Sequence, residues 1–161
     1  MRDHAGEALG DPTRYFVLAA VVYLVLGASL GVTMMLGRLR GDWSGWDYYL
    51  IPSHAHLMLL GWVSMTIFGV AYRMFPAVLV RRLYSSRLAW AHFWLANTAL
   101  IGMALFFFLS RVQEGRWLLP LAVSGSLQFV GVLVFAYNVL RTALLPSLAA
   151  YTPAPPGRSV A

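Results

Sequence analysis

The sequence contains no cysteine and no lysine, and its few acidic residues lie outside the long apolar runs. Without cysteine the chain forms no disulfide, no thiolate metal site and no cysteine nucleophile. Charged residues account for 11% of the 161 residues, whereas a typical soluble domain carries roughly 25%. Together with 60% hydrophobic residues and a mean hydropathy of +0.68, this shortage of charge indicates an integral membrane protein.

Four apolar runs are each long enough to cross a hydrocarbon core about 30 Å thick. They cover residues 15–36, 53–75, 88–109 and 117–141. We therefore expect an all-α fold, an integral membrane four-helix bundle that forms one domain over residues 1–145. Residues 146–161 are rich in proline, which predicts a disordered tail. Pro52 is expected to start the second helix and Pro76 to end it.

Arginine supplies all of the basic charge, and the formal net charge is +6. Four spans place both termini on one side of the membrane, together with eight of the 12 arginines. The positive-inside rule then predicts that both termini are cytoplasmic, in a multi-pass protein of the inner (cytoplasmic) membrane. We attribute the basic charge to this topology and to the lipid bilayer, and expect no nucleic acid partner. Within the spans, Asn97, Gln128 and Asn138 are expected to form hydrogen bonds between helices.

His54 and His56 open the second apolar run, with Ala55 between them. Residues two apart on a regular helix are separated by about 200°, so the two imidazoles cannot grip one ion and instead suit separate ligands on opposite sides. The predicted topology puts both near the outer face. An ionisable group in a membrane span is a functional candidate, although a hydrogen bond to a carbonyl or to water is the alternative interpretation. His92, near the cytoplasmic start of the third span, is expected to be structural.

The order of several short motifs resembles that of one known family. After the His-x-His pair come residues 68–76 (FGVAYRMFP), 92–94 (HFW) and 135–139 (FAYNV). Over residues 50–142 this order resembles the last helices of the catalytic subunit (subunit I) of haem–copper oxidases and nitric oxide reductases. The resemblance implies that His54 is an axial ligand of a high-spin haem and His56 of a low-spin haem. We expect b-type haem, one or two per chain or shared between chains.

Three further residues are candidates for contact with a haem. Met58 is close to the two histidines in the sequence, and Arg111 and Arg116 lie in the third connection, on the same predicted side. The resemblance places such a basic loop beside haem propionates, and arginine pairs well with carboxylates; lipid headgroups are the alternative partners. The family's copper ligands and its other low-spin haem ligand have no histidine counterpart in this sequence. We therefore expect no copper centre and no autonomous oxidase activity.

Three functions stay open from the sequence. The first is a membrane haem-binding, cytochrome b-like protein that transfers electrons, with its second axial ligand supplied by another chain of a homo-oligomer or a respiratory complex. The second is a non-enzymatic accessory or assembly subunit of a respiratory oxidase or nitric oxide reductase. The third is a copper or zinc site shared between chains, since imidazole suits both metals.

Overall fold

A computed structural model of the protein describes residues 12–41, 46–110 and 115–146. Its elements are α2 (Thr13–Leu39), α3 (Trp46–His56), the π-helix η1 (Leu57–Ser64), α4 (Met65–Val78), α5 (Ser86–Ser110) and α6 (Leu118–Leu144). α3, η1 and α4 follow one another without a break and form one long helix. Among the described residues, all the elements are helical and four helices are long and apolar enough to cross a membrane, as predicted. The predicted tail lies, apart from Pro146, outside the described residues.

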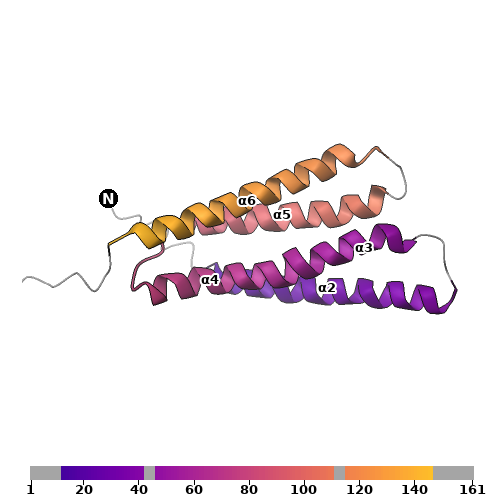
Figure 1. Ribbon diagram of the computed structural model, residues 1–161, viewed down its shortest axis with the longest axis horizontal. Helices are drawn as coiled ribbons and strands as arrows, with labels where there is room; N and C mark the ends of the chain where they lie inside the picture. The colour runs from indigo at the N-terminus through magenta and orange to yellow at the C-terminus, as the bar shows by residue number, and fades with distance from the viewer. Residues whose placement is uncertain (1–11, 42–45, 111–114, 147–161) are drawn as a thin grey trace, which may run out of the picture.

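The helices form two hairpins that lie side by side, as Figure 1 shows. In one hairpin α2 pairs with the long helix of α3, η1 and α4, and in the other α5 pairs with α6. The start of α2 and the end of α6 lie at the same end of the bundle (Figure 1). Which end faces the cytoplasm stays a prediction from the arginine distribution, as does the single domain over residues 1–145.

Both proline boundaries expected from the sequence are wrong. Pro52 lies inside α3, which begins at Trp46, and Pro76 lies inside α4, which continues to Val78. A proline removes one helical hydrogen bond, but membrane helices tolerate that loss where neighbouring groups compensate for it. The second span is therefore longer at both ends than its apolar run.

The end of α4 is closed by its own backbone. Val80 N donates to Ala77 O (3.1 Å) and Arg81 N donates to Pro76 O (2.9 Å). This pair of bonds is the Schellman arrangement, which usually has glycine at the left-handed position. Here Val80 occupies that position with a φ of 50°. The connection towards α5 thus starts from a strained residue.

Every fourth residue of the long helix is buried across η1: Ser53, Leu57, Gly61, Met65 and Gly69. A regular α-helix turns about 100° per residue, so a strict spacing of four would drift around its axis. The wider turns of a π-helix offset that drift. η1 therefore keeps one continuous buried face along the long helix.

Two glycines of this face allow α2 to approach the long helix closely. A Cβ atom on Gly61 would lie 2.6 Å from Cβ of Tyr23 and 3.0 Å from Leu100. A Cβ atom on Gly69 would lie 2.9 Å from Cβ of Phe16. Because real Cβ atoms essentially never come nearer than 3.0 Å to another atom, only glycine permits this approach at both positions.

Buried polar groups tie the two hairpins together. Tyr23 of α2 donates a hydrogen bond to Oδ1 of Asn97 in α5 (2.7 Å), which confirms the interhelical bond expected for Asn97. Asn138 of α6 accepts from Ser85 N (3.0 Å) and donates to Ser85 O (2.8 Å). Its side chain also forms a hydrogen bond with Tyr72 of α4, which confirms the interhelical bond expected for Asn138. The expectation is wrong for Oε1 of Gln128, which is buried with no hydrogen-bond partner in the described part of the chain.

Replacing Gly61 by alanine is expected to destabilise the fold, because the new Cβ would clash with Tyr23 where α2 crosses η1. Overpacking of this kind typically costs about 1–3 kcal/mol, so the midpoint of thermal unfolding in detergent should fall. Gly125→Ala in α6 is the matched control, since a Cβ there meets nothing within 4 Å and alanine is the better helix former. Equal midpoints for the two variants would contradict the close contact between α2 and η1.

Candidate functional site

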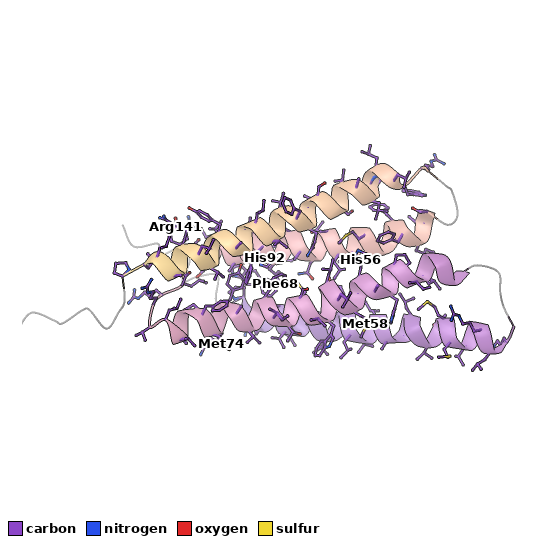
Figure 2. All side chains as sticks on the ribbon, viewed as in Figure 1. His56, Met58, Phe68, Met74, His92 and Arg141 are labelled. Atoms are coloured by element: carbon purple, nitrogen blue, oxygen red, sulfur yellow. The ribbon has the colours of Figure 1, made fainter. Side chains whose placement is uncertain are left out.

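His54 and His56 lie in the last turn of α3, immediately before η1. Because α3 begins at Trp46 and a helix has 3.6 residues per turn, both histidines lie more than two turns inside the helix. They had been expected at its start, directly after Pro52. Both side chains are partly exposed, so each reaches the surface of the bundle. Figure 2 shows His56 between the long helix and α5. π-turns are frequent at functional sites, which adds weight to this segment.

The His54 ring lies against α2. Its Nδ1 is 2.8 Å from the carbonyl oxygen of Gly27. A Cβ atom on Gly31, one turn further along α2, would lie 3.1 Å from Cε1 of His54 and 3.9 Å from its Nε2. The ring therefore occupies a part of the α2 surface where the backbone carries no side chain.

The His56 ring contacts the other neighbour, α5. Its Nδ1 is 2.7 Å from the carbonyl oxygen of Pro52 in its own helix. Its ring centroid lies 4.9 Å from that of Phe107 in α5. His54 thus contacts α2 while His56 contacts α5, which is the separation expected from their spacing on a regular helix. The two imidazoles do not converge on a common point.

These hydrogen bonds fix which ring nitrogen carries the proton. A carbonyl oxygen accepts a hydrogen bond but cannot donate one, so Nδ1 is the N–H donor in both His54 and His56. The neutral imidazole then keeps its lone pair on Nε2, and the described residues give neither Nε2 atom a hydrogen-bond partner. Metal-ligating histidines commonly donate their other N–H to a carbonyl in this way.

Met58 lies on the same side of the long helix as His54. A Cβ atom on Gly27 would lie 2.7 Å from the Met58 sulfur, and Gly27 is the residue whose carbonyl binds His54. Met58 therefore packs against α2 beside His54. It could contact a group bound to His54, but not one bound to His56. In Figure 2 Met58 lies on the α2 side of the long helix.

The two candidate arginines belong to the connection between α5 and α6. Arg111 lies outside the described residues, whereas Arg116 is exposed in the turn before α6. The next residue, Trp117, stacks on Phe106 of α5 with ring centroids 5.7 Å apart. Since Phe107 contacts His56, this turn is held at the same end of α5 as His56. A contact between these arginines and a bound group stays a prediction.

His92 lies at a different level of the bundle and is fully buried. Its Nδ1 is 3.0 Å from the Tyr72 hydroxyl, and the rings of Phe16, Phe68 and Phe135 surround it at centroid distances of 5.2, 4.6 and 5.4 Å. Its Nε2 is buried and has no hydrogen-bond partner among the described residues. Figure 2 shows His92 beside Phe68 and away from His56. These contacts make His92 part of the core between the two hairpins.

Sequence reasoning missed the groups that orient the two histidines. Gly27 and Gly31 are small residues of the kind that let two membrane helices approach closely, but no motif marks a carbonyl as a hydrogen-bond acceptor. The four-residue spacing of small and apolar residues from Ser53 to Gly69 is a sequence signal that could have indicated the π-helix η1. Within residues 12–41, 46–110 and 115–146, no group of three or more His, Cys, Asp and Glu side chains is arranged to hold a metal ion.

The sequence matches the family described as "Cytochrome C and Quinol oxidase polypeptide I" over residues 4–116. This range contains α2, the long helix with both histidines, and α5. The matched range begins well before residues 50–142, over which the short motifs show the resemblance, and it ends before α6. The match therefore adds α2, the helix that orients His54, to the part of the chain that is similar to the family.

Individual relatives are also similar to the chain. "Cytochrome c oxidase polypeptide 1" of Halobacterium salinarum is 34% identical over 87 residues, which are 54% of this chain and 14% of that protein. "Cytochrome c oxidase subunit 1 homolog" of Agrobacterium tumefaciens is 28% identical over 159 residues, 83% of this chain and 29% of that protein. "Cbb3-type cytochrome c oxidase subunit CcoN1" of Stutzerimonas stutzeri is 24% identical over 157 residues, 82% of this chain and 33% of that protein. The chain thus spans about a third or less of the length of these relatives. No solved structure matches the chain.

Replacing Tyr72 by phenylalanine is expected to destabilise the protein, because it leaves Nδ1 of the buried His92 without its partner. An unsatisfied buried polar group costs about 1–3 kcal/mol, so the thermal unfolding midpoint in detergent should fall. Tyr137→Phe in α6 is the control: it removes the hydrogen bond with Tyr84, but Tyr137 is 50% exposed, so water can replace the lost partner. Two variants that unfold at the wild-type temperature would show that the hydrogen bond between Tyr72 and His92 contributes no stability.

Proposed function

Because the chain belongs to the cytochrome c and quinol oxidase polypeptide I family, we propose that it is a membrane haem-binding protein in which Nε2 of His54, of His56 or of both ligates haem iron. The observation that carries the proposal is the pair of hydrogen bonds from Nδ1 to backbone carbonyls, His54 to Gly27 and His56 to Pro52. They orient each ring and leave the Nε2 lone pair for a metal.

Two separate haem sites fit the histidines better than one shared metal ion. His54 contacts α2 and His56 contacts α5, so a group bound to one cannot reach the other. This separation supports the proposal of one or two haems per chain, or of haems shared between chains. The chain has no cysteine, so thioether attachment as in c-type haem is impossible. The haem is therefore held by axial ligation and non-covalent contacts, and we propose that it is b type.

Electron transfer in a respiratory membrane is the proposed role. Bound haem supplies a one-electron iron couple. The chain holds each imidazole in one tautomer and sets it in a partly buried position within an apolar helix, and such surroundings tune the redox potential. Each histidine provides one axial ligand. In this proposal a second axial ligand comes from another chain, in a homo-oligomer or in a respiratory complex.

Arg111 and Arg116 are the proposed partners of the haem propionates. The stacking of Trp117 on Phe106 holds the turn that carries Arg116 near the end of α5, where Phe107 contacts His56. Arginine donors suit carboxylates through paired hydrogen bonds. This arrangement favours contact between the arginines and a haem bound at His56 over contact with a haem bound at His54.

An accessory or assembly subunit of a respiratory oxidase or nitric oxide reductase is the second candidate. The observation that favours it is that both histidines already have contacts within the bundle, His54 with Gly27 and His56 with Pro52 and Phe107. In that role the helices would present an oxidase-like surface to a larger subunit, and His54 and His56 would serve only as helix contacts. Co-purification of haem-free chain with a respiratory complex would support it, whereas a self-contained homo-oligomer with haem would argue against it.

The visible spectrum of the protein purified from membranes, oxidised and reduced, tests haem binding. We expect a Soret band in the wild type that His54→Ala and His56→Ala each weaken and that the double variant loses, because each Nε2 is a ligand. His92→Phe is the control and should keep the band, since His92 lies among Phe16, Phe68 and Phe135 at another level. Circular dichroism checks that each variant keeps its helices.

Two outcomes would rule out haem ligation by these residues: a wild type without a Soret band, and a double variant whose band is unchanged. Metal analysis of the same preparations covers the remaining alternative. Copper or zinc that is present in the wild type without haem, and is lost with His54 and His56, would assign the histidines to a metal site shared between chains.

A further inference from the structure

We propose that Gly27 and Gly31 of α2 are positioning residues of the His54 site. The Gly27 carbonyl selects the tautomer of His54, and the absence of a side chain on Gly31 makes room for its ring. The consequence for ligand affinity rests on the proposed haem function. The tautomer and the ring position are properties of the haem-free chain, so they are tested independently.

The Gly27 carbonyl is placed to serve two donors. In an α-helix the carbonyl of residue 27 accepts the N–H of residue 31, and a carbonyl oxygen has a second lone pair. His54 uses that second position, with its Nδ1 at 2.8 Å. Because the acceptor is backbone, it cannot exchange roles with the imidazole and offers only the Nδ1–H tautomer. The lone pair is therefore held on Nε2.

Gly31 determines whether the ring can reach that carbonyl. The three atoms that a Cβ on Gly31 would approach most closely all belong to His54: Cε1 at 3.1 Å, Nδ1 at 3.5 Å and Nε2 at 3.9 Å. A Cβ contact of 3.1 Å is tighter than nine in ten real ones, so the ring would have to shift by a few tenths of an ångström. A larger side chain at this position would push the ring away from Gly27 and break the hydrogen bond.

The other glycines of α2 separate this effect from general helix contact. At Gly27 the nearest side chain is Met58, so a substitution there would disturb Met58 as well as the acceptor. At Gly37, in the same helix, an added Cβ meets nothing within 4 Å. Gly31 is thus the position in α2 at which a small added side chain would contact His54 before any other residue. Gly37 is its matched control.

The two histidines differ in which helix supplies the carbonyl that orients the ring. His54 depends on a carbonyl of a different helix, whereas the carbonyl that binds His56 belongs to its own helix, at Pro52. A change in α2 is therefore transmitted to His54 and not to His56. Loss of a hydrogen-bond partner of a ligating histidine typically costs about 10–100-fold in metal affinity, so α2 would set the affinity of one site alone.

The first test needs no substitution in α2. Long-range proton–nitrogen NMR correlation of haem-free protein labelled with ¹⁵N-histidine reports which ring nitrogen is protonated, and His54→Ala assigns the signal. We expect the Nδ1–H tautomer for His54 in the wild type. A wild-type His54 that is protonated on Nε2 instead would overturn the proposal.

The second test compares Gly31→Ala and Gly31→Val with Gly37→Ala and Gly37→Val. The ring nitrogen signals of His54 should move slightly with alanine at position 31 and strongly with valine, while those of His56 and His92 stay in place. Both substitutions at position 37 should leave all three histidines unchanged. His54 signals that are the same in Gly31→Val as in the wild type would overturn the proposal.

Haem titration in a His56→Ala background extends the test to the loaded site. We expect Gly31→Val to lower haem affinity at His54 by about 10–100-fold, and Gly37→Val to leave it unchanged. Equal affinities would overturn the positioning role of Gly31 in ligand binding. If the wild type binds no haem, the proposed function fails, and the NMR comparison still decides whether Gly27 and Gly31 position His54.

Discussion

The close approach of α2 to the long helix is the contact on which the rest of the structure depends. Helices in lipid gain no hydrophobic driving force from meeting one another, so close van der Waals contact over small residues has to hold them together. Gly61 and Gly69 provide this on the long helix, and Gly27 and Gly31 provide it on α2. The same proximity brings a histidine within reach of a backbone carbonyl. Helix association and orientation of the imidazole therefore have one physical origin.

The π-helix η1 sets the rotation between the two ends of the long helix. At one end His54 meets α2 and His56 meets α5. At the other end Phe68 and Tyr72 of α4 contact the ring of His92, which belongs to α5 in the opposite hairpin. Without the wider turns of η1, the second half of the helix would be rotated relative to the first. One of the two sets of contacts would then be lost.

The sequence predicted what single helices and their composition determine. The four spans follow from apolar length alone, and the separation of His54 from His56 follows from the rotation per residue. What it could not show depends on how helices meet. Pro52 and Pro76 look like helix ends in isolation, yet the long helix continues past both. The carbonyl partner of His54 is supplied by a residue 27 positions earlier, and only the interhelical distance makes that pairing possible.

The hydrogen bonds of Asn138 have a consequence for the order in which the protein is completed. Ser85 lies in the connection between the hairpins, and both its N–H and its C=O are satisfied by the Asn138 side chain. Asn138 belongs to α6, the last of the described helices to be synthesised. Until α6 enters the membrane, the Ser85 N–H lacks this partner, whereas the Ser85 carbonyl keeps the hydrogen bond from Ala89 N (3.3 Å). The hydrogen bonding of this earlier connection is therefore completed only by the last of the described helices.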